Sequence, residues 1–323
     1  MPDLTYRDAI RTTLREALQQ DERVFIMGED IGAYGGAYGV TKGLMAEFGE
    51  KRIKDSPIAE SVLVGAGIGA AMRGLRPIVE IMTINFSLLA CDQIINIAAK
   101  IHYMSGGQIS VPLVIRTVSG GGNQLAATHS QSFEGFYASV PGLKVVAPAT
   151  PADARGLLKT ALKDHNTVIF VEHSLLYGVK GPVPEGDYAI PFGKADVKRQ
   201  GKDITIVSYL RMTQTALAAA QALAKDGIEA EIVDLRSLRP LDMETVLASI
   251  RKTHRAIIVE EMPKFGGFGG EVTAGIMEHA FDDLDAPVLR ISGKDVPTPY
   301  NKELEQMSFP TPKDIIDAVK SLV

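Results

Sequence analysis

A single carboxylate precedes an unusually apolar run of the chain. Glu60 stands in "KDSPIAESVLVGAGIGAAMRG", residues 54–74, and no further charge follows it until Arg73. A carboxylate in the first turn of a helix is favoured by the helix dipole and needs no function to explain it. The Gly, Ala and Val residues behind Glu60 nevertheless predict a partly desolvated position, in which a carboxylate could act on a buried ligand. Glu60 is therefore the first candidate catalytic residue.

A second candidate, His129, follows a loop of Gly, Asn and Gln in "SGGGNQLAATHSQSFEGF". The loop comes directly after a predicted strand over residues 111–118, and open α/β sheets bind ligands at the carboxyl ends of their strands. None of the histidines has a Cys, His or carboxylate partner at a convincing metal-ligand spacing, so the sequence does not predict a zinc site.

Two glycine-rich motifs resemble ligand-binding loops without meeting their requirements. "VGAGIGA", residues 64–70, satisfies the loose dinucleotide fingerprint, but a poor strand precedes it and Glu80 follows too early to be the ribose-binding acid. These glycines are better explained by close packing of a helix against another backbone than by dinucleotide binding. "EEMPKFGGFGGEVTAGI", residues 260–276, could cradle an anion, yet it lacks the Lys of a P-loop and fits a tight turn better.

Alternating helices and strands must position these candidates. The β-branched apolar runs lack period-2 alternation, as expected for strands covered by helices on both faces. The pattern predicts an α/β protein with two doubly wound domains, residues 1–190 and 191–323, joined by a Gly- and Pro-rich linker over residues 175–203. Helices are expected at residues 5–20, 90–104, 150–164, 215–227, 243–253, 271–284 and 312–323. Strands are expected at residues 23–30, 76–84, 111–118, 143–149, 167–173, 204–210, 229–238, 255–261 and 287–292.

Composition narrows the classes of protein. The chain has 323 residues, 46% of them hydrophobic, and its net charge of -5 is spread along the sequence, which excludes disorder and gives no electrostatic footprint for nucleic acid. The single cysteine, Cys91, excludes an internal disulfide and fits a reducing compartment. With neither a targeting segment nor an apolar run long enough for a bilayer, a cytoplasmic protein is expected, although a mature organellar form would look the same.

Several stretches together resemble a known family. They are "VFIMGEDIGAYGGAYGVTKGL", "DSPIAES", "ACDQIINIAAKIHYMSGGQ", "THSQSFEGFYASVPGLKVV" and "DVPTPY". In this order they resemble the β subunit of the E1 component of 2-oxo acid dehydrogenase complexes, and the pyruvate dehydrogenase branch matches best. The resemblance implies a thiamine-pyrimidine-binding domain, then a transketolase-like C-terminal domain, with thiamine diphosphate as cofactor. The implied reaction is decarboxylation of pyruvate and transfer of the acetyl group to the lipoyl group of E2.

The resemblance also assigns roles to residues. Glu60 matches the acid that hydrogen-bonds the aminopyrimidine ring of the cofactor and promotes its imino tautomer. Phe86 matches the aromatic residue that stacks on this ring, although on sequence alone it would be a core residue. His129 matches the histidine that assists acyl transfer to the lipoyl arm. A potassium site found in some members is matched by the backbone carbonyls of Leu113, Ala161, Asp164 and Asn166.

The resemblance further predicts partners. Thiamine enzymes generally bind the Mg-diphosphate end through a G-D-G motif, which this sequence lacks. The Mg-diphosphate half of the site is therefore expected on a separate α subunit, within an α2β2 heterotetramer. The C-terminal domain is expected to dock onto the lipoyl-bearing E2 core, and no nucleic acid or membrane partner is expected.

Three alternatives remain open at this point. The same chemistry could act on branched-chain 2-oxo acids or on acetoin. An NAD-dependent oxidoreductase would use the "GAGIGA" motif. A non-catalytic assembly protein could share the fold, although Glu60 and His129 are residues able to perform the family's chemistry.

Overall fold

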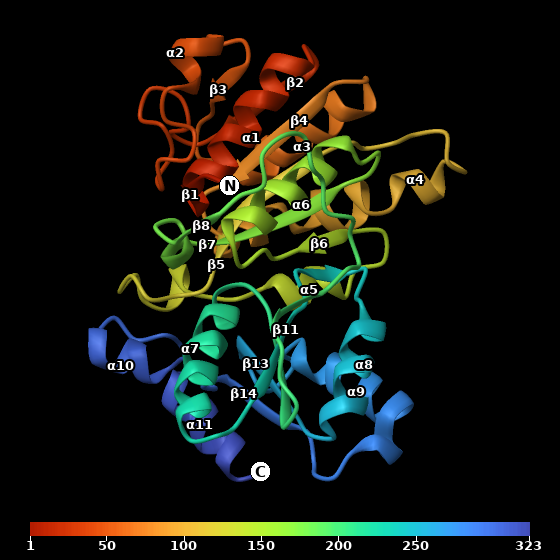
Figure 1. The fold of residues 1–323 in the computed structure, drawn as a ribbon. Coiled ribbons are helices and arrows are strands. Elements are labelled where there is room, and N and C mark those ends of the chain that lie inside the picture. The colour runs from red at the N-terminus through yellow and green to blue at the C-terminus, as the bar shows by residue number, and fades with distance from the viewer. The chain divides into compact units, whose positions relative to one another are not determined.

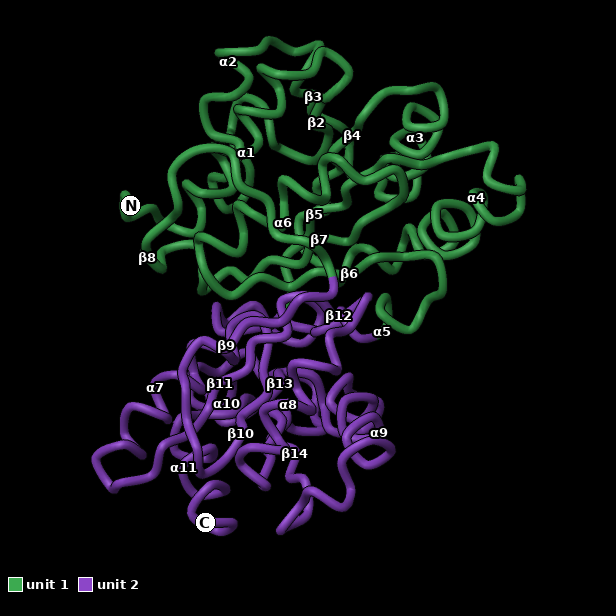
Figure 2. Tube along the Cα trace, turned by 45° about the vertical axis from the view of Figure 1, so that its right-hand side comes forward, with its two compact units in different colours: residues 1–119, 136–192 green, residues 120–135, 193–323 purple.

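The chain folds into two compact units, shown in a computed structural model that describes residues 1–323 (Figures 1 and 2). The first unit contains residues 1–119 and 136–192, and the second contains residues 120–135 and 193–323. The division between Phe192 and Gly193 falls inside the linker expected from the sequence. The inclusion of residues 120–135 in the second unit is a feature that no sequence pattern indicated.

The first unit is built on a parallel sheet. Its strands follow the order β6–β7–β5–β4–β2–β3, and every neighbouring pair runs parallel. Figure 2 shows α1 and α6 on one face of this sheet and α3 on the other. The strands are β2 (Val24–Gly28), β3 (Ile53–Asp55), β4 (Arg76–Ile81), β5 (Val114–Ser119), β6 (Lys144–Val146) and β7 (Val168–His173). The helices are α1 (Tyr6–Gln20), α2 (Leu44–Phe48), α3 (Glu60–Met72), α4 (Ile101–Met104), α5 (Glu134–Ala138, which enters from the second unit) and α6 (Pro151–Lys163).

Capping residues explain where the two helices on one face begin. The Thr5 hydroxyl accepts a hydrogen bond from the Asp8 N–H at the start of α1, and Thr150 does the same for Asp153 in α6. Pro151 follows the second cap, where its missing N–H costs nothing. The two helices pack against each other with their apolar faces inward.

A helical segment after β4 departs from the expected regular helix over residues 90–104. The chain instead forms a 3₁₀ helix η1 (Ile84–Ala90), a π-helix η2 (Gln93–Ala98) and then α4. The Ser87 hydroxyl donates to the Ile84 carbonyl over 2.5 Å and contacts the Tyr137 hydroxyl at 2.6 Å. These hydroxyl contacts hold η1, the segment that leads into the expected helix, and apolar periodicity does not distinguish π from α turns.

A fully buried arginine joins three adjacent strands of the first sheet. Arg116 on β5 places Nε and Nη2 2.7 and 2.9 Å from the carboxylate oxygens of Glu172 on β7, and Nη1 2.7 Å from Glu80 on β4. Burial raises the pKa of Glu172, against the opposing effect of Arg116. Burial lowers the pKa of Arg116, but the charges of Glu172 and Glu80 outweigh this effect and raise its pKa overall. The strands are therefore joined by a buried arginine whose three side-chain nitrogens each contact a carboxylate oxygen.

The second unit has a five-stranded sheet of order β14–β13–β10–β11–β9, parallel except for β9. Helices α7 and α11 cover one face, and α8 and α9 cover the other (Figure 1). The five strands of this sheet are β9 (Asp196–Arg199), β10 (Ile204–Ser208), β11 (Ala230–Asp234), β13 (Ala256–Pro263) and β14 (Leu289–Gly293), and the short strand β12 (Ser237–Arg239) lies outside it. The helices are η3 (Ala127–His129), α7 (Arg211–Lys225), α8 (Met243–Thr253), α9 (Gly269–Ala280), η5 (Phe281–Asp283), α10 (Lys302–Met307) and α11 (Pro312–Lys320). The expectation of two doubly wound α/β domains is confirmed.

Two short strands lie within the segment expected to be an irregular linker. β8 (Lys180–Pro182) pairs antiparallel with β1 (Asp3–Thr5), and η4 (Ser174–Leu176) precedes it. β9 pairs antiparallel with β11. Antiparallel edge pairing needs few residues and no apolar periodicity, so the composition of this segment did not predict it. None of the helices in either unit has the length and apolar character needed to cross a membrane.

The glycines of α3 allow this helix to approach the sheet. A Cβ at Gly67 would lie 2.7 Å from Cγ2 of Val79 on β4, closer than carbon atoms pack. Gly69 in the same helix has no neighbour within 4 Å of an added Cβ. The expected close packing of this glycine-rich helix is therefore specific to one face.

We predict that Gly67→Ala destabilises the isolated chain by about 1–3 kcal/mol, because the added methyl forces α3 away from β4. Gly69→Ala is the matched control and should raise stability by up to about 1 kcal/mol, since alanine favours the helix and meets no neighbour. Urea unfolding followed by circular dichroism measures both. Equal effects of the two substitutions would contradict the packing argument.

Candidate active site

Glu60 lies at the start of α3, behind the end of β3, and is only 3% exposed. The N-cap residue Ala59 offers no side-chain hydrogen bond, and Oε2 of Glu60 is buried without a hydrogen-bond partner. A carboxylate that only capped the helix would be expected to bond to it or to water. The buried oxygen of Glu60 without a partner is free to accept a hydrogen bond from a ligand.

A second carboxylate, Glu29, follows β2 and faces the same position. It is 8% exposed, and its Oε1 is also buried without a partner. Burial raises the pKa of Glu29, and the negative charge of Glu60 raises it further. The Ser56 N–H donates to the Gly28 carbonyl over 2.9 Å, so the segment that leads to Glu60 stays beside the end of β2. Glu29 therefore holds a proton more readily than an exposed glutamate, beside the unpartnered oxygen of Glu60.

Glu29 was not among the residues predicted from the sequence. It belongs to "GED" directly after a buried strand, and an acid at the carboxyl end of a parallel strand is the signal that could have indicated it. Its loop is held by the Gly32 N–H, which donates to Asp55 Oδ1 over 2.6 Å, and by the Thr41 hydroxyl, which donates to the Ile31 carbonyl over 2.7 Å. These bonds hold the backbone that carries Glu29.

Phe86 lies in η1 directly after β4 and is half-buried. Its backbone N–H donates to the Thr83 carbonyl over 3.0 Å, and η1 packs against α3, the helix that carries Glu60. Because β4, β2 and β3 are neighbours in a parallel sheet, the structure brings Phe86, Glu29 and Glu60 to the same edge. An aromatic ring beside two acids can bind a flat heterocycle that donates hydrogen bonds.

His129 lies in the second unit, at the end of η3, and is exposed. Its ring Nδ1 is 2.9 Å from the Thr128 hydroxyl, and its backbone N–H donates to the Ala126 carbonyl over 3.3 Å. The structure therefore does not place His129 in the unit that holds the two acids and Phe86, and its loop is organised by the second unit.

The four residues of the expected potassium set lie around the turn between α6 and β7. The Leu113 and Ala161 carbonyls each accept one backbone hydrogen bond. Nη1 of Arg76 donates to the Asp164 carbonyl over 3.2 Å, which brings a fixed positive charge to this turn. Asn166 Oδ1 is buried without a partner and would be available to a further cation. The residues are compatible with a potassium ion, but the Asp164 carbonyl already accepts a hydrogen bond from Arg76.

Both glycine motifs have structural roles. α3 begins at Glu60, so Gly65 and Gly67 lie in the interior of a helix rather than at a strand-to-helix turn, and the dinucleotide interpretation of this motif is wrong. In the second motif, the Gly269 N–H at the start of α9 donates to Glu260 Oε2 over 2.8 Å. The position at which an external anion would bind is therefore taken by the chain's own carboxylate, as the tight-turn interpretation allows.

Two family models match the chain. The pyrimidine binding domain of transketolase matches residues 3–180, and the C-terminal domain of transketolase matches residues 193–315. A solved structure described as a split-gene transketolase, inactive β4 tetramer, has a TM-score of 0.80 at 26% identity and covers 99% of this chain and 98% of that chain. The transketolase-type fold implied by the resemblance is confirmed.

Similar proteins extend over nearly the full chain. The pyruvate dehydrogenase E1 component subunit beta of Porphyra purpurea is 51% identical over 316 residues, which are 98% of this chain and 96% of that protein. The subunit of Gracilaria tenuistipitata var. liui is 49% identical over 323 residues, 100% of both chains. The mitochondrial subunit of Dictyostelium discoideum is 49% identical over 322 residues, 98% of this chain and 90% of that protein. The chain belongs to the family of pyruvate dehydrogenase E1 β subunits.

The matched pyrimidine binding domain suggests a class of ligand for the two acids that lack partners. A pyrimidine ring carries nitrogen atoms that can donate and accept hydrogen bonds, and the unpartnered oxygens of Glu60 and Glu29 suit such a ligand. The half-buried ring of Phe86 offers a flat apolar surface nearby. The residues present therefore fit the pyrimidine end of thiamine diphosphate.

We predict that Glu29→Gln stabilises the isolated E1 β chain more at about pH 7.5 than at about pH 4. A carboxyl whose pKa is raised by folding gives its full stability below the unfolded pKa and loses it as the pH rises through the folded pKa. Gln stays neutral and avoids this loss. Urea unfolding at both pH values measures the difference.

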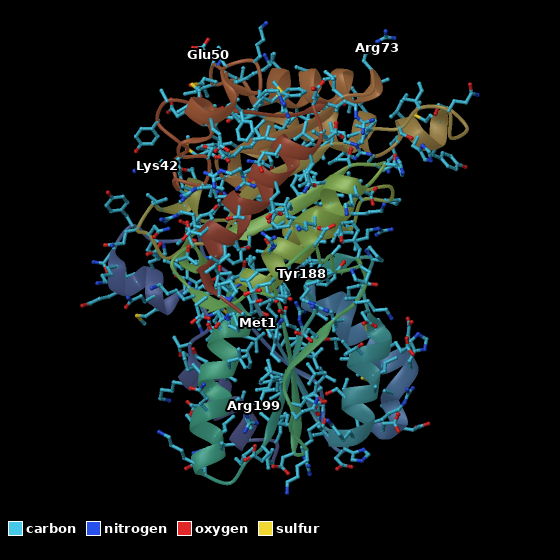
Figure 3. All side chains as sticks on the ribbon, turned by 45° about the horizontal axis from the view of Figure 1, so that its top comes forward. Met1, Lys42, Glu50, Arg73, Tyr188 and Arg199 are labelled. Carbon is cyan, nitrogen blue, oxygen red and sulfur yellow. The ribbon has the colours of Figure 1, made fainter.

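Glu50→Gln is the matched control, because Glu50 projects from the surface (Figure 3). A result for Glu29→Gln that does not differ from this control, or that shows the larger gain at low pH, would contradict the burial argument.

Proposed function

We propose that this chain is the β subunit of a thiamine-diphosphate-dependent pyruvate dehydrogenase E1 component. It would decarboxylate pyruvate and pass the acetyl group to the lipoyl group of E2. The observation that carries the proposal is the buried, unpartnered Oε2 of Glu60 at the edge of a transketolase-type pyrimidine-binding domain. A buried carboxylate oxygen without a hydrogen bond is costly, so a ligand that donates one explains the position best.

In this proposal Glu60 binds the aminopyrimidine ring through Oε2 and shares a proton with a ring nitrogen. Glu29 beside it keeps its own proton more readily because its pKa is raised, which limits the negative charge at the edge. Phe86 orients the ring by contact with its flat face. When bound, thiamine diphosphate supplies the electron sink for decarboxylation, while these residues bind, orient and manage protons.

His129 is proposed to act in the second half of the reaction. When the lipoyl disulfide accepts the acetyl group, its S–S bond breaks and the departing sulfur needs a proton. A protonated imidazole can donate that proton. The exposure of His129 at the tip of a turn supports access by a lipoyl arm.

An α subunit is proposed to complete the site. The chain lacks the G-D-G motif of the Mg-diphosphate site, and relatives over its whole length are named as β subunits. We propose an α2β2 heterotetramer in which residues 1–190 bind the pyrimidine end of the cofactor. Residues 191–323 form the C-terminal domain, which is proposed to dock onto the lipoyl-bearing E2.

We predict that the chain reduces an artificial electron acceptor with pyruvate only when it is co-expressed with the α subunit and supplied with Mg and thiamine diphosphate. Glu60→Gln should lower this rate by about 10²–10⁴-fold, because the neutral amide cannot exchange a proton with the ring. Glu50→Gln, altered at an exposed carboxylate, should keep the parent rate.

Each alternative gives a distinct result in the same assay. Faster acceptor reduction with branched-chain 2-oxo acids or acetoin than with pyruvate would mean that pyruvate is not the main substrate. Activity of Glu60→Gln equal to that of the parent would leave Glu60 as a helix-terminus carboxylate. Absence of activity with every 2-oxo acid would support a non-catalytic assembly protein.

The potassium site is proposed on the carbonyls of Leu113, Ala161, Asp164 and Asn166. We predict that potassium chloride raises the melting temperature above that in sodium or choline chloride at equal ionic strength, because an ion bound only by the folded chain stabilises it. Identical melting temperatures would mean that the Arg76 guanidinium alone serves this turn, and that the potassium proposal is wrong.

A further inference from the structure

The loop that leads to His129 is held by a carboxylate from the far end of the chain. Glu305 in α10 is 1% exposed. Its Oε1 accepts the Gly122 N–H over 3.0 Å, and both of its oxygens lie 3.0 Å from the Gln124 N–H. All of these residues belong to the second unit. Hydrogen bonds from backbone N–H groups to a buried carboxylate are of the strong, charge-assisted kind.

The backbone of this loop adopts conformations that need such support. Gln124 has φ +58° and Ala126 has φ +63° with ψ -169°, a region that is almost restricted to glycine. A residue held in such a region costs about 1–3 kcal/mol and persists only where its surroundings fix it. The strained residues come immediately before η3, the turn that ends at His129.

A second contact limits the same loop from another side. An added Cβ at Gly121 would lie 2.5 Å from the ring of Phe309, so the loop rests directly on that side chain. Phe309 and Glu305 both come from the segment after β14. The amide hydrogen bonds and the ring contact together hold the backbone of this loop in place. The chain continues directly from this loop into the turn that carries His129.

We propose that Glu305 is a positioning residue for His129: its carboxylate fixes the loop and thereby the place at which the imidazole meets the lipoyl group. This inference rests on the proposed function, in which His129 assists acyl transfer. Glu305 does not touch the reacting atoms in this scheme. A misplacement of about 1 Å at a reacting group can cost about 100-fold in rate, so a loosened loop should slow this half of the reaction specifically.

The test separates the two half-reactions in the enzyme assembled with its α subunit. Pyruvate-dependent reduction of an artificial acceptor reports decarboxylation, and mass spectrometry of an added lipoyl domain reports acetyl transfer. Glu305→Gln keeps the size and one acceptor oxygen but places an NH₂ group against backbone donors. We expect it to slow acetyl transfer by about 10- to 100-fold and to change acceptor reduction by less than about twofold.

Two controls distinguish positioning from general damage. Glu303→Gln, an exposed carboxylate of the same helix, should match the parent in both assays. In a His129→Ala background, Glu305→Gln should have no further effect on acetyl transfer, because the two residues act through one step. Hydrogen exchange at the Gly122 and Gln124 amides should be faster in Glu305→Gln.

Several results would overturn the inference. Equal losses in both half-reactions, additive losses with His129→Ala, or unchanged amide exchange would each show that Glu305 does not position His129. A parent enzyme that is inactive in both assays would instead refute the proposed function itself, and this role with it. An active parent combined with any of the first three results refutes the inference alone.

Discussion

The paired charges of Arg116 form the constraint on which the first unit depends. A buried guanidinium does not lose its proton, so Glu172 and Glu80 must remain within reach of it, and β4, β5 and β7 are held in one arrangement. Glu80 extends this constraint to the loop after β2, because a Cβ at Gly36 would lie 3.3 Å from its Oε1. Burial and the charge of Glu80 also raise the pKa of Tyr38 in that loop. The loop that carries Glu29 therefore lies against the centre of the sheet.

The parallel sheet then determines where chemistry can occur. Its neighbouring strands β4, β2 and β3 all end at one edge, and each is followed by one element of the candidate site: Phe86, Glu29 or Glu60. The intervening chain between these residues is long, but the strand order makes them neighbours. This is the usual place for ligands in open α/β sheets. The strand order thus brings candidate residues that are far apart in the sequence to one edge.

The buried acids of this protein differ in their hydrogen-bond partners. The Glu260 carboxylate accepts hydrogen bonds from the Gly269 N–H and the Arg290 guanidinium. The Glu305 carboxylate accepts hydrogen bonds from the loop amides, so both carboxylates fix the backbone around them. Glu60 and Glu29 each retain an oxygen without a partner. Since burial of such an oxygen costs free energy, it is maintained where a ligand or a proton completes the bonding. All four are buried, and only the partners distinguish their roles.

The sequence alone determined the fold class, the long helices and buried strands and the family, and it indicated Glu60 as a candidate, because apolar periodicity and local motifs are properties of neighbouring residues. Only the tertiary structure showed that Glu29 faces Glu60, that residues 120–135 join the second unit and that Glu305 holds the loop before His129. Within the helix expected over residues 90–104 it showed a π-helix followed by the short helix α4. These features depend on contacts between residues far apart in the chain, such as the 181 positions that separate Gln124 and Glu305. Such contacts form only when strand order and burial bring distant groups together, and no local pattern encodes them.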